Sequence, residues 1–238
     1  MSDLHFLTML GFGFVFGLRH ALDTDHVAAV STMLARSSSV WRSGLVGLCW
    51  GVGHTVMLLA AGTLVMAFQV SIPDPVAQAF EGAVGVMLVF LGGSLAWTLY
   101  AERWHWHSHE HDGARHLHVH HHRSGPDHGH VHWLKGAWKP FAVGMVHGLA
   151  GSAALLLLVV SSVRTLGEGL TYIAVFGVGS IFGMMLTGAL ISLPMVYAGS
   201  WGTWGPVAQV AVRGMVSLGS VAVGMVMIAQ TGFLGLWF

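Results

Sequence analysis

Charged residues are scarce in this chain, and their scarcity excludes most soluble folds. Asp, Glu, Lys and Arg make up 8% of the 238 residues, whereas 54% are hydrophobic and the mean hydropathy is +0.69. A typical soluble domain carries about 25% charged residues. The formal net charge is zero, so the composition offers no basic surface for nucleic acid. We therefore expect an all-α integral membrane protein that has the lipid bilayer, and no nucleic acid, as a partner.

Cysteine and catalytic motifs are also nearly absent. Cys49 is the single cysteine and lies in an apolar run, which excludes a disulfide framework and a cysteine-based zinc finger. The sequence contains no Walker loop and no His-Glu-x-x-His motif, and its glutamates lie at the ends of apolar segments or between them. We therefore expect neither an enzyme nor a prosthetic group.

Long apolar runs are abundant. Six of them reach the length of about 20 residues that a helix needs to cross the hydrocarbon core. Most Lys and Arg residues lie in the links after the first, third and fifth runs, so the positive-inside bias predicts that these links are cytoplasmic. Both termini are then extracytoplasmic in the cell inner (plasma) membrane. The predicted spans are residues 5–35, 44–70, 78–101, 137–163, 168–198 and 207–237.

The two halves of the chain resemble each other. A seven-residue stretch around His20 matches one around His147, and residues 50–54 match residues 176–180 at nearly the same offset. Because each copy has three spans, the second copy is inverted in the membrane, as in many secondary transporters. The predicted units are a first three-helix repeat (1–101), a loop (102–136) and a second three-helix repeat (137–238).

Five ionisable residues within eight positions, 19–26, interrupt the first apolar run. One charge near the bilayer centre costs roughly 2.5 to 3.5 kcal/mol on insertion scales, so this cluster needs a compensating partner. The cluster combines two imidazoles, His20 and His26, with two carboxylates, Asp23 and Asp25. We interpret it as a site for a divalent metal ion.

The conformation of this segment decides which carboxylate is the metal ligand. On a continuous helix, His20, Asp23 and His26 share one stripe about 120° wide, and Asp25 lies roughly 140° from His20. If the backbone unwinds in the middle of the motif, Asp25 turns inward beside His26. We expect a broken first helix with Asp25 as the ligand, and Asp23 is the alternative. The competing interpretation is a purely structural ionic network that includes Arg19.

Two further histidines lie in apolar runs. His54 follows two glycines in the second span, and glycine permits close backbone approach at this point. The repeat places His147 in the same midplane region as His20, from the opposite half of the molecule. We expect both histidines at the metal site, and ordinary packing is the competing interpretation for each.

The loop between the halves concentrates imidazoles. Residues 105–132 hold twelve of the seventeen histidines. The loop lacks hydrophobic periodicity, so it is predicted to be cytoplasmic and disordered without metal. Neutral imidazoles bind nickel, cobalt, zinc and copper. We expect the loop to collect metal.

Three motifs together resemble the nickel/cobalt transporter family, including its shorter urease-accessory-type members. They are Arg19-His20-x4-Asp25-His26, the Gly-His-Thr around His54, and the His-Gly-Leu-Ala-Gly-Ser that begins at His147. The resemblance implies a secondary permease for Ni²⁺ or Co²⁺. It also implies that His20, Asp25, His26 and His54 are critical for transport.

The predicted function is transport of Ni²⁺ or Co²⁺ by alternating access around a midplane site, with uptake as the favoured direction. The metal is then a transported substrate. Two alternatives are an efflux permease for the same ions and a membrane-anchored metal chaperone or sensor for metalloenzyme assembly. Cytoplasmic metallochaperones are candidate partners in each case.

Overall fold

Helices dominate the computed structural model of the chain, which describes residues 3–70, 72–101, 106–111, 114–119, 133–150, 163, 165–198 and 202–232. Apart from one small pair of antiparallel strands, these residues confirm the expected helical fold class. The elements in chain order are α1 (Asp3–His20), α2 (Thr24–Leu34), α3 (Val40–Phe68), α4 (Asp74–Ala101), β1 (Trp106–His111), β2 (Ala114–Val119), α5 (Trp133–Ala150), α7 (Leu166–Ala198), the 3₁₀ helix η1 (Gly202–Trp204) and α8 (Gly205–Gln230).

The polar motif interrupts the first helical segment. α1 ends at His20 and α2 begins at Thr24. In the turn between them, the backbone N–H of Leu22 donates to the Arg19 carbonyl (2.9 Å) and that of Asp23 donates to the His20 carbonyl (3.1 Å). Asp23 is the N-cap of α2 and has extended backbone angles (φ −61°, ψ 147°), as this residue type favours at a helix start. The continuous helix that would select Asp23 as a ligand is therefore absent.

Within the described part of the chain, four helices are long and apolar enough to cross a membrane, namely α3, α4, α7 and α8. The chain is therefore a multi-pass membrane protein. α1 and α2 together occupy the first predicted span. α5 occupies the start of the fourth, and residues 151–162 of that span lie outside the described part of the chain. The full arrangement of six spans stays a prediction.

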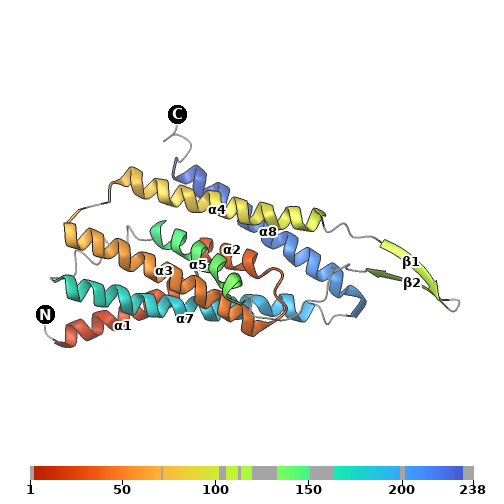
Figure 1. Ribbon diagram of the computed structural model, residues 1–238, viewed down its shortest axis with the longest axis horizontal. Coiled ribbons are helices and arrows are strands. Elements are labelled where there is room, and N and C mark those ends of the chain that lie inside the picture. Colours follow the sequence, from red (N-terminus) through yellow and green to blue (C-terminus); the bar gives the residue numbers. More distant parts are fainter. Residues whose placement is uncertain are drawn as a thin grey trace.

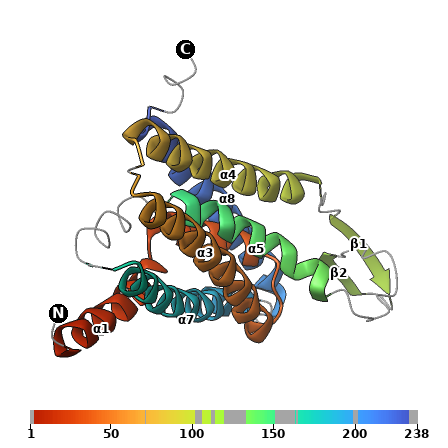
Figure 2. The ribbon, with the colours of Figure 1, turned by 60° about the vertical axis from the view of Figure 1, so that its left-hand side comes forward.

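The helices form layers that place α2 and α5 in the interior (Figures 1 and 2). α3 packs against both α5 and α7, and α7 also packs against α1. α4 runs along α8 on the opposite side of the bundle. The short helix α2 contacts α8, α4 and α7. The break after α1 thus brings the polar motif into the middle of the bundle.

Connections gather at the two ends of the bundle (Figure 1). The N-terminus and the turn between α3 and α4 lie at one end. The link between α2 and α3, the β1–β2 hairpin and the start of α8 lie at the other. This second end carries the links that are rich in Lys and Arg.

Glycines allow α5 to approach α3 closely. A Cβ atom at Gly144 of α5 would overlap the carbonyl oxygen of Trp50, and one at Gly148 would overlap that of His54. Small residues let helix backbones approach in lipid, where no hydrophobic force drives helix association. This contact sets His147, which lies between the two glycines in sequence, beside α3.

Hydroxyl groups connect α4 with α8. The Oγ atom of Ser217 donates to the Gly92 carbonyl (2.8 Å), and that of Ser220 donates to the Leu88 carbonyl (3.0 Å). Both serines are buried. Such interhelical hydrogen bonds contribute about 0.6 kcal/mol each on average in a membrane protein.

An arginine links α2 to α8. Nε of Arg213, on α8, donates to the carbonyl of Ala35 (3.0 Å), the C-cap residue of α2. The last carbonyls of a helix lack intrahelical partners, and a cation is favourable at that end of the helix dipole. α2 is therefore anchored to α8 at the end opposite its polar motif.

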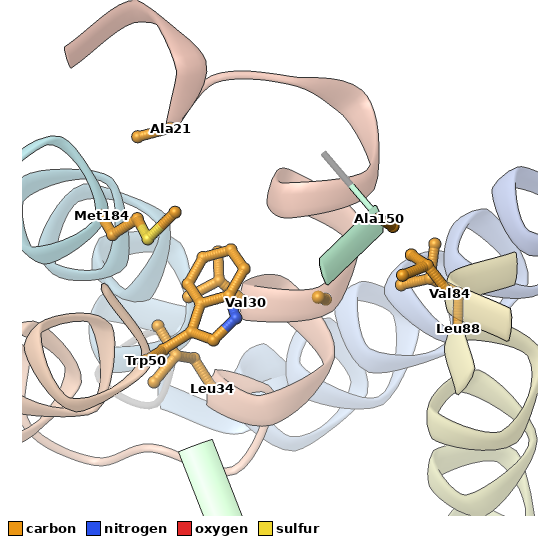
Figure 3. Packing of buried hydrophobic residues seen from close by; sticks show 9 residues of the cluster. Ala21, Val30, Leu34, Trp50, Val84, Leu88, Ala150 and Met184 are labelled. Carbon is orange, nitrogen blue, oxygen red and sulfur yellow. The ribbon is translucent and has the colours of Figure 1, made fainter. Parts of the chain in front are cut away.

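A buried tryptophan lies at the centre of the apolar core. Trp50 is fully buried and lies among Val30 and Leu34 of α2 and Met184 of α7 (Figure 3). Many large apolar side chains on the outside of the helices are instead exposed, including Phe90, at 73%. An apolar exterior of this kind suits a protein surrounded by lipid.

The described part of the loop between the halves forms an antiparallel hairpin. In its register, His107 pairs with His118 and His109 pairs with His116. Residues two apart on a strand share a face, so these four positions lie on the same face of the hairpin. The disorder predicted for the loop without metal stays a prediction.

Candidate metal site

Four of the five histidines outside the loop meet inside the bundle. His20 is the last residue of α1, His26 lies in the first turn of α2, His54 lies in the middle of α3, and His147 lies near the end of α5. The His26 ring centroid lies 4.4 Å from that of His20, 5.2 Å from that of His54 and 5.1 Å from that of His147. The structure thus brings all four predicted histidines together.

Three of these histidines form a group that could hold a metal ion. One ring nitrogen from each of His20, His26 and His54 lies within 4.8 Å of the others. Imidazole nitrogens bound to one ion at 2.0–2.1 Å stand about 3 Å apart, so small side-chain movements are sufficient to form the site. His26 and His54 are buried, and none of their ring nitrogens has a hydrogen-bond partner among the described residues.

Buried polar nitrogens without partners are unfavourable, and a metal ion relieves the penalty. Leaving such a group unsatisfied costs about 1–3 kcal/mol, and the site holds several within one cluster. Neutral imidazoles offer lone pairs, which are the donors that divalent transition metals bind. The chemistry of this cluster therefore fits a metal ion better than a packed apolar core.

Asp23 contacts His20. Its Oδ2 accepts a hydrogen bond from Nδ1 of His20 at 2.7 Å, and its side chain is 52% exposed. This contact fixes the proton on Nδ1 and leaves Nε2 of His20 free as a metal ligand. Metal-binding histidines commonly donate their other N–H to a carboxylate in this way.

Asp25 faces two buried imidazoles. Its Oδ1 lies 3.6 Å from Nδ1 of His26, and its Oδ2 lies 3.9 Å from Nε2 of His147. These separations are too long for hydrogen bonds. Asp25 therefore faces His26 and His147, whereas Asp23 contacts His20.

The tautomer of His147 follows from its backbone contact. Nδ1 of His147 lies 3.3 Å from the carbonyl of Val143, which can only accept, so Nδ1 carries the proton. Nε2 then presents a lone pair toward the Asp25 carboxylate. Two acceptors that face each other across 3.9 Å attract a cation between them.

Two aromatic rings border the imidazoles. Trp50 lies 5.1 Å from His26 and 5.4 Å from His147 between ring centroids, and Phe176 lies 5.4 Å from His20. The sequence reasoning used Trp50 and Phe176 only as matched positions of the repeat. That match could have identified both residues as neighbours of the site. Trp50 lies in the span that follows His20, and Phe176 lies in the span that follows His147.

These features define a class of protein, namely a multi-pass membrane protein with a candidate metal site made of imidazoles inside the bundle. The chain belongs to the NicO family of high-affinity nickel-transport proteins, whose sequence model matches residues 6–233. The family consists of transporters rather than enzymes, and its transported substrate is nickel.

One curated relative is the urease accessory protein UreH of Bacillus sp. (strain TB-90). It is 39% identical over 196 residues, which cover 82% of this chain and 80% of the relative. No solved structure matches the chain. The match confirms the resemblance to the shorter, urease-accessory-type members that the sequence motifs indicate.

Proposed function

We propose that the protein is a secondary permease that carries Ni²⁺, and Co²⁺ as a second substrate, across the inner membrane, with uptake as the favoured direction. One observation carries the proposal. Nitrogen atoms of His20, His26 and His54 lie within 4.8 Å of one another in the middle of a membrane bundle. Ionisable groups at such a depth mark ion pathways by default.

In the loaded site, His20, His26 and His54 bind the ion, and the Asp25 carboxylate approaches as the anionic ligand. His147 completes the site from the second half through its free Nε2. Asp23 stays outside the coordination sphere and orients His20, as its 2.7 Å contact favours. Nitrogen and carboxylate ligands without thiolate suit nickel in a tetragonal or octahedral geometry.

Matched helix contacts support an inverted repeat. A Cβ at Gly17 of α1 would overlap the Phe176 carbonyl of α7, and a Cβ at Gly144 of α5 would overlap the Trp50 carbonyl of α3. The sequence alignment pairs Gly17 with Gly144 and Phe176 with Trp50. When each residue is replaced by its counterpart in the other half, the contact of Gly17 with Phe176 becomes the contact of Gly144 with Trp50.

The ring contacts follow the same exchange. His20 lies 5.4 Å from Phe176, and its counterpart His147 lies 5.4 Å from the counterpart ring, Trp50. In the repeat, α1 corresponds to α5, α3 to α7, and α4 to α8. The contact of α1 with α7 therefore corresponds to that of α5 with α3, and the contacts α3–α7 and α4–α8 each correspond to themselves. These correspondences support two inverted three-helix repeats with the site at their interface.

Transport then proceeds by rocking of the two repeats around the ion. The sequence has no nucleotide-binding motif, so the membrane potential, an ion gradient or capture of metal inside the cell drives it. The Lys- and Arg-rich end of the bundle is placed in the cytoplasm and both termini outside. Protons compete with metal for each imidazole, so affinity falls in acid.

The histidine-rich loop, 102–136, is proposed as a cytoplasmic metal collector. The hairpin register sets two histidine pairs, 107 with 118 and 109 with 116, on one face. Adjacent cross-strand positions are about 5 Å apart, close enough for shared ligation. The loop would lower the free metal concentration at the cytoplasmic mouth.

Flux in proteoliposomes of known orientation tests the function. Nickel is expected to enter faster when it is presented on the side of the termini, with cobalt slower and zinc slowest. Empty liposomes treated identically are the control. Absence of nickel flux above that control in both orientations would contradict the permease.

A metal-chaperone role is the second candidate, because the relative UreH is described as a urease accessory protein. Deleting residues 105–132 separates the two roles. A permease keeps nickel translocation with altered affinity, whereas a chaperone that works through its loop loses nickel delivery to a metal-dependent enzyme. Both quantities can be measured on the same variant, as vesicle flux and as urease activation in cells.

A further inference from the structure

Trp50 carries a buried hydrogen-bond donor that has no acceptor. Its side chain is 0% exposed, and its indole Nε1 has no hydrogen-bond partner among the described residues. All the other buried nitrogens of this kind in the described residues belong to His26, His54 and His147. The indole N–H is therefore the one unpaired donor of the cluster whose donor role is certain, because an indole nitrogen cannot accept.

Trp50 and Asp25 flank the same two imidazoles. The indole ring lies 5.1 Å from the ring of His26 and 5.4 Å from that of His147. The Asp25 oxygens lie 3.6 Å and 3.9 Å from nitrogens of those same residues. Asp25 is 27% exposed, so its carboxylate is not fixed by close packing on all sides and can shift against these imidazoles.

A carboxylate that binds a metal through one oxygen has a second oxygen to satisfy. In a buried site that oxygen needs a hydrogen-bond donor, and ligating carboxylates are usually held in this way. The imidazole nitrogens that bind the ion have no proton to give. The donors left beside Asp25 are the second ring nitrogen of a neutral imidazole and the indole N–H of Trp50. Only the indole N–H belongs to a side chain that cannot itself bind the ion.

We propose that the indole N–H of Trp50 is a positioning group that donates to the Asp25 carboxylate when the ion is bound. The inference rests on the proposed function of the site and adds a residue to it. The carboxylate would give the unpaired N–H an acceptor. Trp50 thereby selects the position of the carboxylate that faces His26 and His147.

Trp50→Phe tests the proposal, because it keeps an apolar ring and removes the donor. Nickel affinity of the purified protein, measured by calorimetry, is expected to fall by about 10- to 150-fold, the usual effect of a hydrogen bond to a charged group. Phenylalanine is smaller than tryptophan, so the metal-free protein is expected to lose some stability at this fully buried position. Unchanged nickel affinity of the folded variant would overturn the proposal.

A double-mutant cycle with Asp25→Ala identifies the acceptor. If Trp50 donates to Asp25, Trp50→Phe causes no further loss of affinity once Asp25 is alanine. If Trp50→Phe lowers nickel affinity by the same factor when Asp25 is alanine, the proposal is overturned. The proposal is also overturned if the effect of Trp50→Phe disappears in His147→Ala but not in Asp25→Ala. Trp97→Phe, at a 69% exposed position on α4, is the matched control and is expected to leave affinity unchanged.

Ultraviolet resonance Raman spectra give a direct readout. The indole band that reports N–H hydrogen bonding is expected to shift when nickel binds, and the shift should be absent in Trp50→Phe. A band already shifted in the metal-free protein contradicts the proposal. His26→Ala tests the metal site separately from the role of Trp50. If His26→Ala still binds nickel, the proposed site itself is wrong. If His26→Ala loses nickel binding and the indole band does not shift in the wild type, only the role of Trp50 is wrong.

Discussion

Nickel flux through the protein is expected to fall by more than about 100-fold when His26 or His54 is replaced with alanine. Changes at residues that only support a metal ligand already cost 10–100-fold in affinity or activity. Both imidazoles are buried, and each contributes a nitrogen to the group within 4.8 Å. The measurement is radiotracer nickel flux into proteoliposomes, normalised to the amount of folded protein.

His5→Ala is the matched control for these variants. His5 lies on α1 about four turns, or roughly 22 Å along the helix axis, before His20. Its replacement should leave flux within twofold of wild type. Undiminished flux in His26→Ala or His54→Ala would show that the ion passes elsewhere.

The same measurement is expected to rank the two aspartates. Asp25→Asn should reduce flux as severely as loss of a histidine, because it removes the anionic ligand. Asp23→Asn keeps an acceptor for the Nδ1 proton of His20, so its flux should fall by about tenfold or less. The reverse order would make Asp23 the metal ligand.

Gly144→Ala and Gly17→Ala are each expected to destabilise the protein by about 1–3 kcal/mol, the usual cost of overpacking. The new Cβ would overlap the carbonyl oxygen of Trp50 in the first case and of Phe176 in the second. Both oxygens belong to helix backbone and cannot rotate away. Unfolding in detergent, followed by circular dichroism, measures the change.

Gly219→Ala on α8 is the control, because a Cβ there meets nothing within 4 Å. It should be neutral or stabilise the helix by up to about 1 kcal/mol. If Gly144→Ala and Gly17→Ala were as harmless as Gly219→Ala, α5 would not approach α3, nor α1 approach α7, at these glycines. The proposed equivalence of the two contacts would then lose its support.

The class of protein and the residues of the cluster could be predicted from the sequence. Sparse charge and long apolar runs are sufficient for a membrane protein. A dense polar motif inside such a run identifies His20 and His26, because ionisable groups in lipid need partners. The matched stretches of the two halves then point to His147.

For the two aspartates, the sequence favours a broken helix with Asp25 as the ligand and keeps Asp23 as the alternative, and the ligand itself stays a prediction. On a continuous helix, Asp23 shares a stripe with the histidines, whereas the structure ends α1 at His20 and gives Asp23 the N-cap position. Whether a helix breaks depends on what its polar groups contact in three dimensions. The unpaired donor of Trp50 could not be predicted either, because a tryptophan in an apolar run indicates only a packed side chain.

The anchoring of α2 by Arg213 has a consequence for the loaded protein. α1 packs against α7, whereas α2 is joined to α8 through the Ala35 carbonyl and also contacts α4. An ion bound to both His20 and His26 would therefore add a cross-link between α1 and α2, which are joined in the chain by a three-residue turn and both pack against α7. Nickel should stiffen the whole bundle in the manner of a structural metal, although it remains bound only for one transport cycle.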